Sequence, residues 1–174
     1  MCKLIVAELK TKCLTLRPLT QSDRENLIDL LADKLVAQTY MLPDFDSRAQ
    51  YEPLADRLIQ MSGERKPKRL IYGLIADGTL IGMLNDVGFD DDKIEIGYAV
   101  RPKYQNQGYA TEAFSAVIRA LFGMGFSCVR AGYFEGNDAS RRVMEKCGLL
   151  PTGETETIEY RGVLHRCILC EIRA

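Results

Sequence analysis

The chain has little of several features that mark specialised proteins. Its 174 residues include one histidine and no tryptophan, and 23 basic residues are balanced by 24 acidic ones, for a formal net charge of −1. Nucleic-acid binders need a basic face that releases counterions from phosphates, so this balance argues against a nucleic-acid partner. No apolar run approaches the roughly 18 residues that span a bilayer, so no membrane-spanning helix is expected.

No targeting signal is expected at the start of the sequence. Only four apolar residues, 4–7, precede Glu8, too few for the core of a signal peptide. We therefore expect a cytoplasmic protein. A composition of 47% hydrophobic and 27% charged residues is that of an ordinary globular protein. At this length the prediction is a single domain over residues 1–174.

Cysteines are present but scattered, at positions 2, 13, 128, 147, 167 and 170. Cys167 and Cys170 have C-x-x-C spacing, but they lie in a strand-like run, where residues three apart face opposite sides. With one histidine in the chain, this pattern predicts neither a zinc site nor a disulfide framework. We expect reduced, mostly buried thiols and no metal.

Hydrophobic periodicity divides the chain into alternating strands and helices. In chain order it predicts a strand at 13–16, a helix with leucines 27, 30, 31 and 35 inward, a helix ending at 63, strands at 70–76, 79–84 and 94–100, a helix at 108–122, a strand at 128–134, a helix ending at 148, and strands at 155–160 and 164–172. Thr20 and Asp23 resemble a capping box, and Asp77-Gly78 predicts a two-residue hairpin. Residues 36–63 are irregular, broken by Pro43 and Pro53, and their first part is expected to form a loop over a binding site.

The stretch from Glu95 to Ala113 is the most informative, because a two-faced strand passes there through a short polar loop into a helix. Helix starts expose unpaired N–H groups and a positive dipole end, and Gly108 lets the backbone approach an anion closely. The small residues Gly97 and Ala99 leave room for a thin ligand along the strand. We therefore expect a phosphate with a slender arm, as in a nucleotide thioester.

Residues 105–110, Gln-Asn-Gln-Gly-Tyr-Ala, resemble the (Gln/Arg)-x-x-Gly-x-(Gly/Ala) pyrophosphate loop of the GNAT superfamily of acetyl-CoA-dependent N-acetyltransferases. Residues 136–148, Gly-Asn-Asp-Ala-Ser-Arg-Arg-Val-Met-Glu-Lys-Cys-Gly, are similar to its RimJ/RimL branch of ribosomal-protein N-terminal acetyltransferases. The resemblance is strongest over 95–149, whereas 36–66 match nothing specifically. It implies an α/β (α+β) fold with a mixed, mostly antiparallel sheet of six to seven strands, about four helices and a splayed central strand pair.

The resemblance also implies how acetyl-CoA binds and where CoA leaves as product. The backbone of residues 105–111 would hold the pyrophosphate, and residues 98–100 would line the pantetheine arm. A main-chain N–H of this strand, that of Val100 or a neighbour, would polarise the thioester carbonyl. The expected cofactor-binding residues are Tyr98, Ala99, Val100, Gln105, Asn106, Gln107, Gly108, Tyr109, Ala110, Thr111 and Asn137. Asn137 could instead cap a helix, and the two roles are compatible.

Two residues are expected to act in catalysis. An amine nucleophile is largely protonated at neutral pH, and Glu95 could accept its proton directly or through water. A solvated glutamate without a role, with water as the base, stays open. Ser140 would protonate or hydrogen-bond the departing thiolate, unless it is only a first-turn serine. His165, Tyr133, Tyr160 and the basic loop 64–69 are interpreted as structural or solvated.

The sequence thus predicts acetyl transfer from acetyl-CoA to a primary amine, by direct attack in a ternary complex. The acceptor is either a protein N-terminus or a small molecule. A non-catalytic acyl-CoA-binding module is the alternative; it would need Gly108 and Asn137 but not Glu95 or Ser140. A dinucleotide-binding domain is disfavoured because G-x-G-x-x-G is missing. The oligomeric state stays open, a homodimer included.

Overall fold

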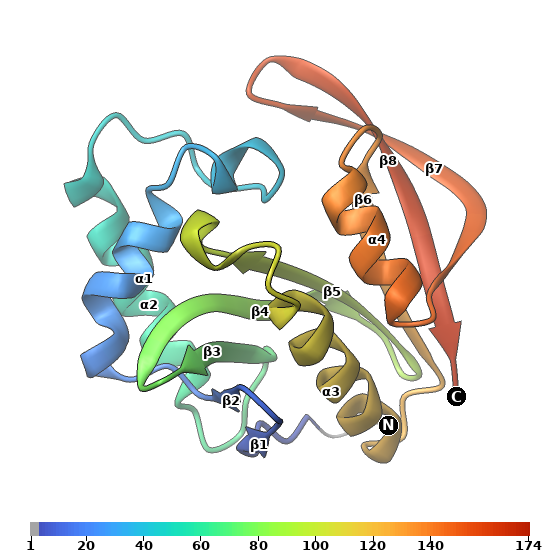
Figure 1. Ribbon diagram of the computed structural model, residues 1–174, viewed down its shortest axis with the longest axis horizontal. Coiled ribbons are helices and arrows are strands. Elements are labelled where there is room, and N and C mark those ends of the chain that lie inside the picture. The colour runs from blue at the N-terminus through green and yellow to red at the C-terminus, as the bar shows by residue number, and fades with distance from the viewer. Residues whose placement is uncertain (1–3) are drawn as a thin grey trace.

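The computed structural model describes residues 4–174 and contains one mixed sheet of eight strands within that range (Figure 1). The strands are β1 (Leu9–Lys10), β2 (Thr15–Arg17), β3 (Ile71–Ala76), β4 (Thr79–Phe89), β5 (Lys93–Val100), β6 (Cys128–Phe134), β7 (Leu150–Tyr160) and β8 (Val163–Arg173). The helices are α1 (Arg24–Leu31), α2 (Glu52–Ser62), α3 (Tyr109–Gly123) and α4 (Asp138–Lys146), with short 3-10 turns at Gln21–Asp23, Val36–Gln38, Arg48–Tyr51 and Pro102–Tyr104. The predictions for the first residues and for Cys2 fall outside the described range.

The strand order is β1-β2-β3-β4-β5-β6-β8-β7, and every neighbouring pair is antiparallel except β5 with β6. The parallel pair is short, running only from Lys93 opposite Cys128 to Glu95 opposite Arg130. Beyond Glu95 the two strands separate. The predicted mixed fold with a splayed central pair is therefore confirmed.

Helices cover both faces of the sheet. One apolar cluster joins α3 and α4 to the sheet through side chains such as Phe114 and Met144, and another joins α1 and α2 through Leu27 and Ala55 (Figure 1). Successive side chains of β5 point to opposite faces of the sheet, so this strand contributes Ile96 to the first cluster and Ala99 to the second. β5 is thus the strand on which the two halves of the core meet.

The hairpin between β3 and β4 forms as predicted. Asp77 and Gly78 both have positive φ, 47° and 74°, as a two-residue type I′ turn requires. β4 continues to Phe89, well past its predicted end at Leu84. A register shift between Asp86 and Gly88 interrupts the two-residue alternation, so hydropathy alone does not reveal the end of the strand.

Three sequence expectations need correction. The sheet has eight strands rather than six or seven, because β1 has only two residues, too few for a periodic signal. The helix α1 ends at Leu31, so Leu35 is not on its inward stripe and is 60% exposed. Pro53 lies in the first turn of α2 and so begins this helix instead of interrupting it.

The cysteines of the described range, Cys13, Cys128, Cys147, Cys167 and Cys170, are free thiols. Cys167 and Cys170 pack into different apolar clusters, as expected for residues three apart on a strand. Within residues 4–174 no three His, Cys, Asp or Glu side chains are grouped to hold a metal ion. Over the same residues, every helix is too short or too polar to cross a bilayer.

Candidate active site

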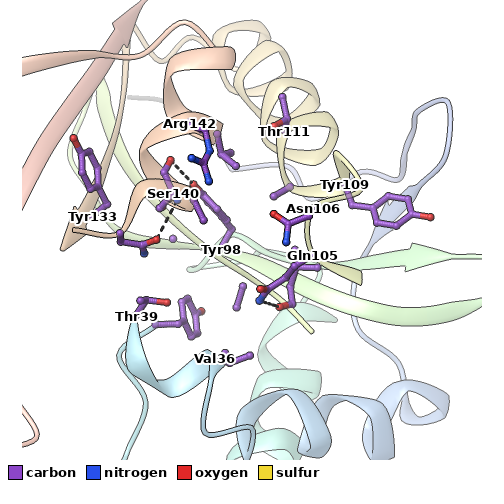
Figure 2. Close-up of a pocket in the computed structure, with 18 of the residues that line it drawn as sticks. Val36, Thr39, Tyr98, Gln105, Asn106, Tyr109, Thr111, Tyr133, Ser140 and Arg142 are labelled. Carbon is purple, nitrogen blue, oxygen red and sulfur yellow. Dashed lines mark hydrogen bonds between the residues drawn. The ribbon is translucent and has the colours of Figure 1, made fainter. Parts of the chain in front are cut away.

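A cavity of about 570 Å³ opens where β5 and β6 diverge (Figure 2). One wall is the segment before α2, residues 35–40, and the floor is β5 from residue 96 to 100. The loop that enters α3, residues 104–111, forms the far end. Gly132 and Tyr133 of β6 and the start of α4 close the remaining side. The cavity thus passes through the sheet between two strands.

The loop before α3 presents a run of unpaired amides to this cavity. Gly108 precedes the helix with φ +85°, and Asn106 also has positive φ, 59°. Within the described chain, the N–H groups of residues 106–111 donate no hydrogen bond. A Cβ added to Gly108 would meet nothing within 4 Å, so the space above it is open. Converging free amides at a helix start form an anion-binding concavity.

Two glutamine side chains brace this loop. Gln105 Nε2 donates to the carbonyl oxygen of Val100 at 2.9 Å, and Gln107 Nε2 donates to that of Lys103 at 3.0 Å. Gln107 consequently turns away and does not line the cavity. The other residues expected to bind the cofactor all line it: Tyr98, Ala99, Val100, Gln105, Asn106, Gly108, Tyr109, Ala110, Thr111 and Asn137.

Strand β5 directs alternate amides into the gap. The N–H of Arg101, next after β5, donates to Ile81 at 2.8 Å, which orients the odd-numbered residues of β5 toward β4. Val100 therefore points its N–H and C=O toward β6, which has already diverged, and the carbonyl is taken by Gln105. The Val100 N–H is left facing the cavity. A main-chain donor so placed can stabilise an oxyanion.

Ser140 and Tyr98 meet on the other side of the gap (Figure 2). The Tyr98 hydroxyl lies 2.9 Å from Ser140 Oγ, and burial raises the pKa of this phenol, so it stays protonated. The N–H of Ser140 donates to Asn137 Oδ1 at 3.1 Å, which makes Asn137 the N-cap of α4. Because the cap uses only Oδ1, the amide nitrogen of Asn137 remains available to a ligand.

Glu95 lies at the point where β5 and β6 part, since it is the last β5 residue paired with β6. Its side chain does not line the cavity, although Gly97, two residues on and on the same strand face, does. Burial raises the pKa of the Glu95 carboxyl and the nearby Glu156 carboxylate adds to this, while Arg130 opposes it. A raised pKa makes a carboxylate a stronger base.

The wall formed by residues 35–40 was missed as a set of site residues. Tyr40 covers Gly97, where an added Cβ would be 3.5 Å from the Tyr40 ring, and its hydroxyl donates to Asn85 Oδ1. Val36 and Thr39 lie across the cavity from Tyr98 (Figure 2). The irregular sequence had suggested a loop over a binding site but offered no motif for these residues.

The hairpin of β7 and β8 holds this wall in place through Tyr160. Its hydroxyl donates to the carbonyl of Ala37 at 2.7 Å and accepts the N–H of Leu42 at 3.2 Å. Arg161 adds an ion pair to Asp44 at 3.2 Å. The interpretation of Tyr160 as a structural residue holds, and its hydroxyl, expected to contact solvent, instead bonds backbone groups of the wall.

Tyr160→Phe is expected to loosen the wall while leaving the sheet intact. Losing two neutral hydrogen bonds at about 1 kcal/mol each should lower Tm by about 4–8 °C for a chain of this size. Amide hydrogen exchange should accelerate in residues 37–42 and not in α3. Tyr109→Phe is the control, since the Tyr109 hydroxyl makes no hydrogen bond within residues 4–174. Unchanged amide hydrogen exchange in residues 37–42 would show that Tyr160 does not hold this segment in place.

The other residues interpreted as structural lie mostly outside the cavity. His165 stacks on Phe134 with ring centroids 4.3 Å apart, and of this group only Tyr133 lines the cavity. In the basic loop 64–69, the Arg69 guanidinium lies 2.9 Å from the carboxylate of Asp86, which is buried. Arg69 is therefore a structural ion-pair partner rather than a solvated loop residue.

Two cationic residues that line the cavity, Arg142 and Lys146, were not identified from the sequence. A signal for them was present. Ala139, Arg142, Val143 and Lys146 follow the i, i+3, i+4, i+7 spacing of one helix face, and all four line the cavity. Once Ser140 is placed at the site, this spacing identifies the helix face nearest to it.

Comparisons with known proteins agree with this geometry. A family model for the acetyltransferase (GNAT) domain matches residues 14–150. The uncharacterized N-acetyltransferase YoaA of Bacillus subtilis is 26% identical over 160 residues, covering 88% of this chain and 89% of YoaA.

Solved structures of similar fold include RimL, a ribosomal L7/L12 alpha-N-protein acetyltransferase, with a TM-score of 0.82 and 16% identity over 98% of this chain and 96% of RimL. The microcin C7 self-immunity acetyltransferase MccE, solved with acetyl-CoA and AMP, has a TM-score of 0.80 and 17% identity over 94% of this chain and 93% of MccE. At such identities these two structures show a shared fold alone.

Proposed function

The chain belongs to the acetyltransferase (GNAT) family of acetyl-CoA-dependent N-acetyltransferases, and from that premise we propose that it acetylates a primary amine by direct attack within a ternary complex. One observation carries the proposal. The unpaired amides of residues 106–111 and the inward N–H of Val100 open onto the same cavity. The loop amides can donate hydrogen bonds to a diphosphate. The Val100 N–H can donate to a thioester carbonyl at the other end of a slender arm.

Acetyl-CoA supplies the activated acetyl group as a thioester. The residues of this chain fit it, because the space over Gly108 is open and no carboxylate lines the cavity within residues 4–174. The loop amides would hold the diphosphate, residues 98–100 the pantetheine arm, and the Asn137 amide nitrogen its polar groups. The Val100 N–H would then stabilise the negative charge that develops on the carbonyl oxygen.

Protons move at two residues in this scheme. As the amine nitrogen bonds to the acetyl carbon, its proton passes to Glu95 through water, because the Glu95 side chain does not itself line the cavity. As the carbon–sulfur bond breaks, Ser140 Oγ donates a proton or hydrogen bond to the departing thiolate. The Tyr98 hydroxyl, 2.9 Å from Ser140 Oγ, holds the serine hydroxyl in place, and solvent restores any proton that Ser140 gives up. Both substrates are bound throughout.

The acceptor enters from the wall of residues 35–40, opposite the loop that would hold the diphosphate. Within the described chain, this cavity has no Asp, Glu or His to bind an ammonium group. A site of this kind favours amines that are readily neutral. The α-amino group, with a pKa of about 8, loses its proton far more easily than lysine at about 10.4. We therefore favour an α-amino acceptor, the class named for RimL.

A mass-spectrometric screen tests both parts of the proposal. Unblocked peptides, the same peptides with a blocked N-terminus and a free lysine, and polyamines are each incubated with protein and acetyl-CoA. The expected result is gain of one acetyl group on unblocked N-termini. Gain only on lysine or polyamine would overturn the acceptor class. Coenzyme binding without gain on any amine would support the non-catalytic binding module instead.

A further inference from the structure

Arg142 and Lys146 are unpartnered cations at the edge of the cavity. Both are exposed and line it, and within residues 4–174 neither forms a hydrogen bond or ion pair. Arg141, immediately before Arg142 in sequence, behaves differently: it lies off the cavity and bonds Asp138 at 3.1 Å and Glu145 at 2.8 Å. On α4, the arginine that points away from the cavity is therefore paired with carboxylates, whereas the two cations that line the cavity have no partner within the described residues.

These cations face the start of α3 across the groove. The Cys147 thiol, next to Lys146, lies 3.5 Å from the carbonyl oxygen of Thr111 in the first turn of α3. Arg142 and Thr111 both line the cavity and lie at the upper edge of the site in Figure 2. The unpaired amides of residues 106–111 and the two side-chain cations therefore lie on opposite sides of the same cavity.

The charge balance of the groove favours an anion of more than one charge. No carboxylate lines it within the described chain, so the two cations are uncompensated. Arg142 and Lys146 are four residues apart on α4, and like charges at this spacing repel each other. They also face the positive end of the α3 dipole, so their placement is unfavourable unless an anion binds between them. Arginine can bind a phosphate through two parallel hydrogen bonds, while lysine acts as a point charge.

We propose that Arg142 and Lys146 bind the phosphate groups of coenzyme A from the α4 side, opposite the amides of the α3 loop. This rests on the proposed function, which brings coenzyme A into the groove. The coenzyme carries a diphosphate and a 3′-phosphate, and both are the chemistry that these cations recognise. The phosphates would then be bound by backbone amides near Gly108 on one side and by the Arg142 and Lys146 side chains on the other.

Isothermal titration with coenzyme A tests the pair. The double variant Arg142→Gln/Lys146→Gln is expected to raise Kd about tenfold, the sum of two partly exposed charge pairs. Arg141→Gln is the matched control, a neighbouring arginine on the outer face, and should keep the wild-type Kd. Wild-type affinity should also fall more steeply than that of the double variant as salt rises to about 0.5 M.

A second arm with 3′-dephospho-coenzyme A identifies which phosphate is held. Weakening for coenzyme A alone assigns the cations to the 3′-phosphate, and equal weakening for both assigns them to the diphosphate. A double variant that binds both coenzymes as tightly as Arg141→Gln would overturn the inference. Wild-type protein that binds neither coenzyme would instead overturn the proposed function, so the two failures are distinguishable.

Discussion

Gly108→Val should abolish the stabilisation that acetyl-CoA confers on this protein. At about 100 times Kd a bound ligand adds about 2.7 kcal/mol, or about 5–10 °C in Tm for a chain of this length. A branched side chain at Gly108 would project into the open space where the loop amides converge. It would also strain the backbone, since φ is +85° there. Thermal shift with and without acetyl-CoA measures the loss.

Gly153→Val separates loss of binding from strain. Gly153 has φ +84° and nothing within 4 Å of an added Cβ, yet it does not line the cavity. This variant should lose intrinsic stability in the same way and keep its response to acetyl-CoA. If Gly108→Val does not fold, Gly108→Ala provides a smaller obstruction for the same measurement. A full ligand response in a folded Gly108 variant would contradict the assignment of the diphosphate to these amides.

Glu95→Gln is expected to lower kcat by about 10²-fold, the usual contribution of a general base. The amide nearly preserves the size of the side chain but cannot take the proton of the attacking amine. Coenzyme affinity should not change, because Glu95 lies away from the loop and the groove. Steady-state kinetics on the acceptor found by the screen, with a thermal shift for acetyl-CoA, gives both quantities.

The pH profile adds a second reading of the same residue. Burial and the Glu156 carboxylate raise the pKa of Glu95, so wild-type kcat should fall as pH drops through that raised value and the base becomes protonated. The Gln variant should lack this limb. Glu8→Gln, an exposed glutamate beside the edge strand β1, is the control. A fall in kcat below about threefold would remove Glu95 from the mechanism.

Sequence reasoning was most effective where the structure depends on neighbouring residues. The hairpin at Asp77-Gly78, the cap at Asn137 and the helix start after Gly108 each follow from local backbone preferences. The cavity-lining role of ten expected cofactor residues followed from one loop motif and the strand before it. Gln107 was the exception, because its side chain bonds Lys103 within the loop.

Residues brought in from distant segments could not be found this way. Tyr160 bonds Ala37 across more than a hundred residues, and Tyr40 covers Gly97 from a segment without regular structure. Neither pairing leaves a periodic pattern. Arg142 and Lys146 form an intermediate case, since their shared helix face can be read from spacing but their lack of ion-pair partners cannot.

The sequence alone determined the order of the longer strands and helices, the open glycine turn at the start of α3 and the resemblance to the family, because turns, caps and amphipathic periods are properties of adjacent residues. Only the tertiary structure decided that β5 and β6 part after Glu95, that residues 35–40 face the resulting gap, and that the Glu95 carboxyl stays outside it. Those features arise from packing between distant segments, where burial and hydrogen bonding select one arrangement from many that the local preferences allow.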